Sequence, residues 1–526
     1  MVYTQKGMIF LDLVIKLGML LIFFGVMVYV GFYCRRHATD VNGFVLGGRS
    51  VGPWLTAFAY GTSYFSAVVF VGYAGQFGWK YGIASTWIGI ANAFLGSLLA
   101  WAVLGRRTRI MTQHLQSNTM PQFFASRFRA PSLKIIASVI IFIFLIPYTA
   151  SLYNGLSRLF GMAFHVPYAA CVIVMAILTG IYVIAGGYMA TAVNDFIQGI
   201  IMLVGIVAVI AAVLNSRGGF MASLAQLAQV SDPAASDIPG VFNSFFGPDP
   251  VNLLGVMILT SLGTWGLPQM VQKFYAIKSE KAITKGMIVS TFFAVVVAGG
   301  CYFLGGFGRL FGDQVDVAAE GYDAIIPAML SNLTPFLIAV VVILVLSASM
   351  STLSSLVLTS SSTLTLDFLK PLMKKEMDEK RQLVIMRALI AVFIAISAVI
   401  AIFQYSSGSA FIAQMMGISW GALAGAFLAP FLYGLYWKRT TKAGCVASFA
   451  FSTVVMILNV TSRPAFPALL QSPINAGAFC MLAGMVIVPL VSVITKAPDR
   501  QTVDQIFSCY DRRVVVKAKD AIEADE

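Results

Sequence analysis

The sequence predicts an all-α integral membrane protein. Of its 526 residues, 59% are hydrophobic and only 11% are charged, whereas a soluble protein is about 25% charged. Apolar stretches of about 20 residues recur from one end to the other, and each is long enough to cross a hydrocarbon core of roughly 30 Å. Because lipid offers the backbone no hydrogen bonds, long unbroken apolar runs must cross it as helices.

We expect about thirteen membrane-spanning helices in a single domain, residues 1–526. The first, 10–33, is too long for the apolar core of a signal peptide and lacks a cleavage site of small residues, so we expect it to be retained. The other spans are expected at 54–79, 83–104, 132–160, 166–186, 191–214, 251–273, 282–308, 333–368, 382–404, 409–436, 442–462 and 474–495. Residues 496–526 are expected to form a short cytoplasmic tail.

Thirteen crossings place the two ends of the chain on opposite sides of the bilayer. If the N-terminus lies outside and the C-terminus inside, most of the 35 Lys and Arg residues fall in the inside segments. This excess predicts that orientation, in the plasma membrane of a prokaryote. It also accounts for the net charge of +13 without a nucleic acid partner.

The second and seventh expected spans are interrupted by polar residues and glycine. Residues 60–66 read YGTSYFS, and residues 261–268 read SLGTWGLP, in which the proline removes a backbone donor. The two spans occupy corresponding places in two successive sets of five. This placement is typical of secondary transporters with inverted repeats, in which unwound backbone near the midplane binds ions and substrate. The alternative is that glycine and proline merely kink both helices.

The ninth expected span carries an unusual number of hydroxyl groups. Eleven of the seventeen residues from Ser347 to Thr363 are Ser or Thr, and they follow the apolar run 335–346. Hydroxyl oxygens are neutral acceptors, and together with backbone carbonyls they can coordinate Na⁺ without several buried carboxylates. The alternative is a packing role, in which Ser and Thr bond to the carbonyl four residues earlier or let helices approach closely.

Asp195 lies in TAVNDFIQGIIML, at the start of the sixth expected span. An ionisable group this close to the membrane core is a functional candidate by default. Its carboxylate could complete a second sodium site with Ser354 and Ser355. Equally, it could cap the start of the helix or pair with a nearby basic residue.

Four segments, taken in order, carry a resemblance to a known family: VLGGRSVGPWLTAFAYGTSYFSA (45–67), AGGYMATAVNDFIQG (185–199), GTWGLPQMVQKFYA (263–276) and SASMSTLSS (347–355). Together they resemble the sodium/solute symporter family, whose members include proline, pantothenate, sialic acid and galactose transporters. The resemblance implies a LeuT-type fold, with ten helices in two inverted repeats of five over 54–436. One extra helix (10–33) would precede this core and two (442–495) would follow it.

The resemblance also implies the residues of the binding sites. A sodium ion would bind between the broken first core helix and the eighth, at Thr62, Phe65, Ala348, Ser351 and Thr352. A second is possible at Asp195, Ser351, Ser354 and Ser355, so one or two sodium ions would be coupled. Candidates for binding the solute are Tyr64, Ser66, Tyr148, Thr264, Trp265 and Gln414. Tyr64 stands where the proline transporters have an aspartate, which argues against a proline-like role. The segment GLPQMVQKFYAIKSEKA (266–282) looks closer to the pantothenate branch. The subfamily, pantothenate-, proline- or sialic acid-like, stays open.

The predicted function is sodium-coupled import of a small polar organic solute by alternating access. The solute would be an amino acid, a carboxylate, a sugar acid or a vitamin, and the protein would act as a monomer. One alternative is a proton-coupled symporter of the same fold, with Asp195 as the proton carrier. The other is a sensor or membrane enzyme derived from a transporter, but an enzyme needs a catalytic constellation at depth, and the sequence offers none.

Overall fold

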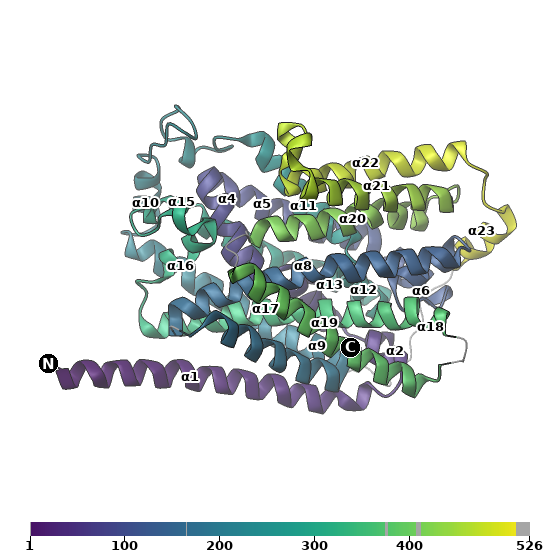
Figure 1. Ribbon diagram of the computed structural model, residues 1–526, viewed down its shortest axis with the longest axis horizontal. Coiled ribbons are helices and arrows are strands. Elements are labelled where there is room, and N and C mark those ends of the chain that lie inside the picture. The colour runs from purple at the N-terminus through teal and green to yellow at the C-terminus, as the bar shows by residue number, and fades with distance from the viewer. Residues whose placement is uncertain (1, 165, 374–376, 407–411, 512–526) are drawn as a thin grey trace.

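The computed structural model describes residues 2–164, 166–373, 377–406 and 412–511 (Figure 1). The described residues are nearly all helical, and they form no β-strand. The long helices lie roughly parallel to the long axis of the molecule (Figure 1). The first residues of the expected span 409–436 lie outside the described residues, and so does the last part of the expected tail, 512–526.

The long helices form the body of the molecule. They are α1 (Val2–Tyr33), α8 (Pro131–Phe164), α9 (Tyr168–Ser216), α11 (Pro250–Gly266), α13 (Glu280–Phe293), α17 (Pro335–Thr363), α19 (Glu379–Ser406), α20 (Ile412–Tyr436), α21 (Lys442–Thr461) and α22 (Pro473–Ile494). Shorter helices connect or extend them. They are α2 (Val41–Leu46), α3 (Pro53–Tyr64), α4 (Ala74–Tyr81), α5 (Thr86–Ala91), α6 (Arg106–His114), α7 (Met120–Arg127), α10 (Phe220–Leu227), α12 (Pro268–Ala276), α14 (Gly300–Gly305), α15 (Val317–Glu320), α16 (Ile325–Leu330), α18 (Lys370–Leu372) and α23 (Arg500–Phe507).

Ten helices within the described residues are long and apolar enough to cross a membrane, or eleven if the bent pair α11 and α12 is one span. Two of the ten are 47 and 49 residues long, more than twice the about 20 residues that one crossing needs. The longer one, α9, contains the non-helical residue Gly187 (φ 56°, ψ −144°), and the other, Val68–His114, contains Gly82 (φ 60°). Because each of these two helices continues through a bend, it counts once although it is long enough for two crossings. This explains why the number of helices is lower than the thirteen crossings expected. The number of crossings and the orientation stay predictions.

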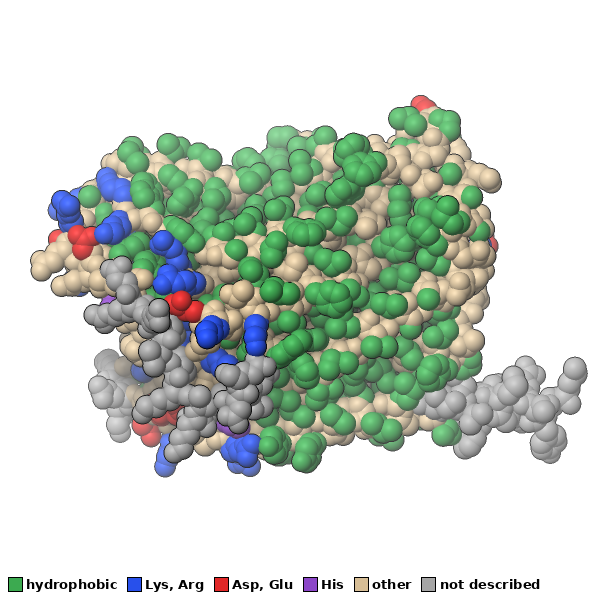
Figure 2. Space-filling view, turned by 180° about the vertical axis from the view of Figure 1, so that it is seen from behind, with side chains coloured by type: hydrophobic (Ala, Val, Ile, Leu, Met, Phe, Trp, Pro, Cys, Tyr) green, Lys and Arg blue, Asp and Glu red, His purple; other side chains and the backbone are tan. Residues whose placement is uncertain are grey.

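The charged and apolar side chains are separated along the molecule. Figure 2 shows hydrophobic side chains over most of one face and Lys and Arg gathered at one end. That end carries α2, α6, α18 and α23, whereas α1 begins at the opposite end (Figure 1). The basic end is the one that the sequence predicts to face the cytoplasm.

Helix α17 lies in the centre of the bundle, packed against α1, α3, α8, α9 and α19. Every residue from Ser347 to Thr363 is buried. Helix α9 approaches α3 closely at Gly199, where an added Cβ would lie 2.2 Å from the ring of Phe58. The hydroxyl-rich stretch therefore faces other helices and not lipid.

Candidate functional site

Helix α3 stops in the middle of the bundle. Its last hydrogen bond runs from the Phe65 N–H to the Gly61 carbonyl, and Phe65 itself is extended (φ −83°, ψ 122°). Helical structure resumes after Ser66, whose carbonyl accepts from the Phe70 N–H. The last carbonyls of a helix have no partners within it. The break therefore presents free carbonyl oxygens in a fully buried place.

Five oxygen atoms converge at this break. The Thr352 hydroxyl lies 3.2 Å from the carbonyl oxygens of Thr62 and Phe65, and 3.1 Å from that of Ala348. The Ser351 hydroxyl lies 3.2 Å from the Thr62 carbonyl and 3.1 Å from the Ala348 carbonyl. The structure thus brings together all five residues predicted for the first sodium site.

This group of oxygens has more acceptors than protons. Each hydroxyl carries one proton, so the Ser351 and Thr352 hydroxyls cannot donate to all of these carbonyls at once. A small cation would satisfy every oxygen together. Within the described residues, no three His, Cys, Asp or Glu side chains come together to hold a metal ion.

The residues predicted for a second sodium site are arranged differently. The Ser354 hydroxyl donates to the Ser351 carbonyl of its own helix (2.9 Å). The Asp195 carboxylate and the Ser355 hydroxyl instead face the ammonium group of Lys273, at 3.8 Å and 3.0 Å. The Ser355 hydroxyl also lies 2.9 Å from the hydroxyl of Ser63.

The sequence does not single out Lys273, which is the last residue of the expected span 251–273 and one of the Lys and Arg residues assigned to the inside segments. In the structure its side chain is 2% exposed, and it lies on α12, just after the bend that separates this helix from α11. A lysine at the end of an apolar span is the feature of the sequence that could have identified it. Beyond the bend, its side chain lies in the interior of the bundle beside Asp195.

Three of the residues predicted to bind the solute cluster around a tryptophan that the sequence reasoning missed. The rings of Tyr64 and Tyr148 lie 5.8 Å and 5.9 Å from that of Trp420, and the Tyr148 hydroxyl faces Ser66 and Trp420. Within the described part of the chain, Ser66 Oγ, Tyr148 Oη and Trp420 Nε1 are buried without a hydrogen bond of normal geometry. Buried polar groups normally have partners, so these three are suited to receive a ligand.

The other three predicted solute residues are placed elsewhere. The Thr264 hydroxyl donates to the Gly96 carbonyl (2.8 Å), beside a cavity of about 10 Å³ that Tyr64 also lines. The Trp265 indole donates to a backbone carbonyl of the neighbouring segment, that of Leu95 (2.9 Å). The Gln414 side chain accepts a hydrogen bond from Arg463 (3.5 Å). The structure brings none of these three into the cluster around Trp420.

The bend between α11 and α12 lies beside this cluster. The two helices are inclined by 45°, and an added Cβ at Gly263 would lie 2.5 Å from the Trp420 ring. Gln269, in the first turn of α12, is buried, and its side-chain amide has no hydrogen-bond partner among the described residues. The N-terminus of a helix favours negative charge, so this bend can accept an anionic group.

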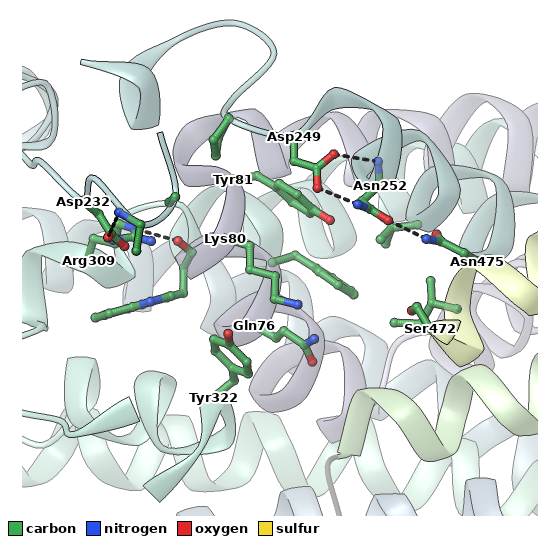
Figure 3. Close-up of a pocket in the computed structure, with 17 residues that line it drawn as sticks. Gln76, Lys80, Tyr81, Asp232, Asp249, Asn252, Arg309, Tyr322, Ser472 and Asn475 are labelled. Carbon is green, nitrogen blue, oxygen red and sulfur yellow. Dashed lines mark hydrogen bonds and ion pairs between the residues drawn. The ribbon is translucent and has the colours of Figure 1, made fainter. Parts of the chain in front are cut away.

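A larger cavity of about 560 Å³ lies at the end of the molecule away from α6 and α18. Figure 3 shows Lys80 directed into this cavity between Tyr81 and Gln76, with Asn252 and Asn475 on its wall. Polar side chains surround it, including an ion pair between Arg309 and Asp232 (3.0 Å). The cavity is large enough for a small organic solute.

At the basic end, by contrast, hydrogen bonds join distant segments. The Arg49 guanidinium donates to the carbonyls of Ser117 (2.5 Å) and Tyr275 (3.3 Å). Next to it, the Val51 N–H donates to the Ala276 carbonyl (3.2 Å). Burial lowers the pKa of Arg49 to about 10, so the guanidinium keeps its charge at neutral pH. The structure therefore has a large cavity toward one end and hydrogen bonds that join distant segments at the other.

Comparison with known proteins gives consistent matches. The model of the sodium:solute symporter family matches residues 44–451. The osmoregulated proline transporter of Bacillus subtilis (strain 168) is 27% identical, over 93% of this chain and 96% of its own. Sodium/proline symporter 2 of Staphylococcus saprophyticus is 30% identical, over 84% of this chain and 85% of its own. A solved structure, the substrate-bound outward-open state of a Na⁺-coupled sialic acid symporter, has the same fold (TM-score 0.72, 16% identity, 92% of this chain and 99% of that one).

Proposed function

The chain belongs to the sodium:solute symporter family, and on that premise we propose that it imports an amino acid or a related small carboxylate together with sodium. Its family and relatives are transporters and not enzymes. Sodium-coupled solute symport is the activity that the family and the fold support. The multi-pass protein would act as a monomer in a prokaryotic plasma membrane.

The coupling ion would bind at the break in α3. The observation that carries this proposal is the group of five oxygens around the Ser351 and Thr352 hydroxyls, whose acceptors outnumber their protons. A sodium ion there would join the end of α3 to the middle of α17. Its binding energy would hold the extended residue Phe65 in one conformation and so prepare the neighbouring solute site.

The solute would bind between the break in α3 and the bend at α12. The rings of Tyr64, Tyr148 and Trp420 offer an apolar and aromatic surface, and the Ser66 hydroxyl adds a hydrogen bond. The first turn of α12, with the unpartnered amide of Gln269, would receive a carboxylate. The relatives named for proline transport support an amino acid. A sugar acid or a vitamin is the other outcome of the test below.

Import would proceed by alternating access. The cavity of about 560 Å³ would open to the outside, and the Arg49 hydrogen bonds would close the cytoplasmic side until both ligands are bound. We assign the moving parts to a ten-helix core, 54–436. One helix (10–33) would precede this core, and two helices (442–495) and a cytoplasmic tail (496–526) would follow it. This division follows the inverted repeat that the family resemblance implies.

A thermal-shift experiment tests the proposal, because a ligand that binds only the folded state raises its stability. Purified protein would be heated in sodium chloride or in choline chloride at the same pH and ionic strength. We expect a higher melting temperature in sodium. We then expect a further rise with one of a panel of amino acids, carboxylates, sugar acids and vitamins, in sodium only. Equal solute effects in choline would overturn the sodium proposal in favour of proton coupling.

A further inference from the structure

Lys273 places a positive charge where the sequence predicted a second sodium ion. Its ammonium nitrogen lies 3.8 Å from the Asp195 carboxylate and 3.0 Å from the Ser355 hydroxyl. It also lies 5.1 Å from the centre of the Tyr188 ring. Asp195 is fully buried and Lys273 is 2% exposed. These contacts come from α9, α12 and α17, so the ammonium group joins three helices that are far apart in the sequence.

We propose that the Lys273 ammonium group occupies the second cation site permanently, so that the protein binds and couples one sodium ion per cycle. This inference rests on the proposed function, because it assumes that a sodium ion binds at the break in α3. It concerns the number of ions and not whether sodium is used. The lysine would act as a tethered cation that cannot leave its site.

The chemistry of the ammonium group fits this role. Like Na⁺ it carries one positive charge, and it has three donors and no acceptor. It donates to the Ser355 hydroxyl, which in turn lies 2.9 Å from Ser63. The face of the Tyr188 ring is a favourable neighbour for a cation. The group therefore finds an anion, a hydroxyl and an aromatic face, as a small cation in this place would.

The surroundings of Asp195 favour a cation beside it. Within the described part of the chain, neither carboxylate oxygen accepts a hydrogen bond. Removing one member of a buried ion pair leaves an uncompensated charge, which is strongly destabilising. Lys273 is the cation that the structure places beside this carboxylate.

A sodium ion between Asp195 and Ser355 would have to share that space with Lys273. The ammonium nitrogen already lies within hydrogen-bond distance of Ser355, so an ion bound to this hydroxyl would meet a like charge at close range. Like charges in a buried place repel strongly because little solvent screens them. The tethered charge and a second sodium ion therefore exclude each other.

Equilibrium binding of radioactive ²²Na⁺ to the purified full-length protein tests the inference, and it needs no knowledge of the solute. We expect one ion per wild-type molecule. In Lys273→Gln the Asp195 carboxylate would be free to bind a cation, and we expect two. In the double variant Asp195→Asn/Lys273→Gln, which carries neither charge, we expect one again. If the single variant fails to fold, the double variant can still be tested, because it leaves no buried charge unpaired.

Each outcome of this experiment decides between the two proposals. Two ions in the wild type would overturn the tethered cation and leave the proposed function intact. One ion in a folded Lys273→Gln variant, with its sodium-dependent thermal shift preserved, would also overturn it. No sodium bound to the wild type would instead overturn the proposed sodium site. Thr352→Val in the Lys273→Gln background separates the two sites, because one ion should remain bound.

Discussion

The hydroxyl of Thr352 lies 3.2 Å from the carbonyl oxygen of Phe65, the residue at which α3 stops. This contact joins α17 to the break through one of the two hydroxyls available to a sodium ion there. Thr352→Val keeps the shape of the side chain but removes that oxygen. We expect the sodium concentration that gives half of the maximal thermal shift to rise at least about tenfold, which corresponds to about 1.4 kcal/mol.

Two further variants make the Thr352 result specific. Thr352→Ser keeps the hydroxyl, and we expect sodium binding within about threefold of the wild type, well under one factor of ten. Thr363→Val removes a buried hydroxyl of the same helix that bonds to the carbonyls of Thr359 and Ser360 of that helix. Its sodium dependence should be unchanged. If Thr363→Val impaired sodium binding as much as Thr352→Val, the assignment of the ion to the break in α3 would fail.

The hydrogen bonds of Arg49 predict how the closed end opens. Arg49→Gln removes the charged donors that hold the Ser117 and Tyr275 carbonyls, and a hydrogen bond to a charged group contributes about 1.5–3 kcal/mol. We expect the amides of Val51 and Lys278, which pair across this closure, to exchange with deuterium at least about tenfold faster. Hydrogen-exchange mass spectrometry measures this directly.

Arg439→Gln is the matched control for Arg49→Gln. Arg439 also donates to backbone carbonyls, those of Val493 and Thr495, but it joins the segment after α20 to the end of α22. Exchange at Val51 and Lys278 should stay at the wild-type rate in this variant. Unchanged exchange in Arg49→Gln would mean that Arg49 does not hold the closure.

The close approach of Gly263 to Trp420 gives a prediction for the solute site. A Cβ at Gly263 would lie 2.5 Å from the Trp420 ring, closer than atoms can pack, so Gly263→Ala must displace the indole. For the solute that the screen identifies, we expect the concentration that gives half of the maximal thermal shift to rise at least about tenfold. The sodium-dependent shift should remain.

Gly161→Ala serves as the control for Gly263→Ala, because an added Cβ at Gly161 meets nothing within 4 Å. It should leave both shifts unchanged. Loss of the sodium shift together with the solute shift in Gly263→Ala would indicate general disruption of the bundle and would contradict a local effect on Trp420.

Asp323 predicts a dependence of stability on pH. Burial raises the pKa of its carboxyl to about 6, while the hydrogen bond from the Ile412 N–H (3.3 Å) opposes that rise. Between about pH 4, the ordinary pKa, and about pH 6, the folded protein holds a proton that the unfolded chain has released. The contribution of Asp323 to stability is therefore greatest below this window and falls as pH rises through it, by an amount on the order of 3 kcal/mol.

Asp323→Asn should remove this dependence, because asparagine does not ionise and can still accept from the Ile412 N–H. We expect the variant to melt a few degrees above the wild type at about pH 7.5, and at the same temperature near pH 4. Asp313→Asn, at a carboxylate that is 72% exposed, should follow the wild-type curve. An Asp323→Asn variant that is less stable at every pH would contradict the prediction.

Some of the candidate site followed from the sequence because local patterns determine it. The polar interruption at 60–66 and the hydroxyl-rich stretch that begins at Ser347 can be recognised in the sequence, and Ser351 and Thr352 are consecutive residues of that stretch. The family resemblance supplied the pairing of the two segments. Their meeting depends on only one helix break and one helix face.

Other residues of the site could not be predicted because they depend on bends and on which face of a helix turns inward. Lys273 stands at the end of the expected span 251–273, where a basic residue is typical of the membrane surface, and the structure instead buries it beside Asp195, beyond the 45° bend. Gln414 and Trp420 lie six residues apart on α20, so they point in widely different directions. The sequence does not show which of the two residues points toward the break in α3. The prediction names the polar residue, Gln414, but in the structure the aromatic residue, Trp420, lies there.

A lysine that stands in for an ion sets a ceiling on how far the solute can be accumulated. One sodium ion moving down 100 mV and a tenfold concentration difference releases about 3.7 kcal/mol. That energy can sustain a ratio of inside to outside solute of roughly 400-fold, whereas a second mobile ion would square the ratio. In return, each imported molecule would draw down the sodium gradient by a single ion, which suits a nutrient taken up in bulk better than one scavenged from traces.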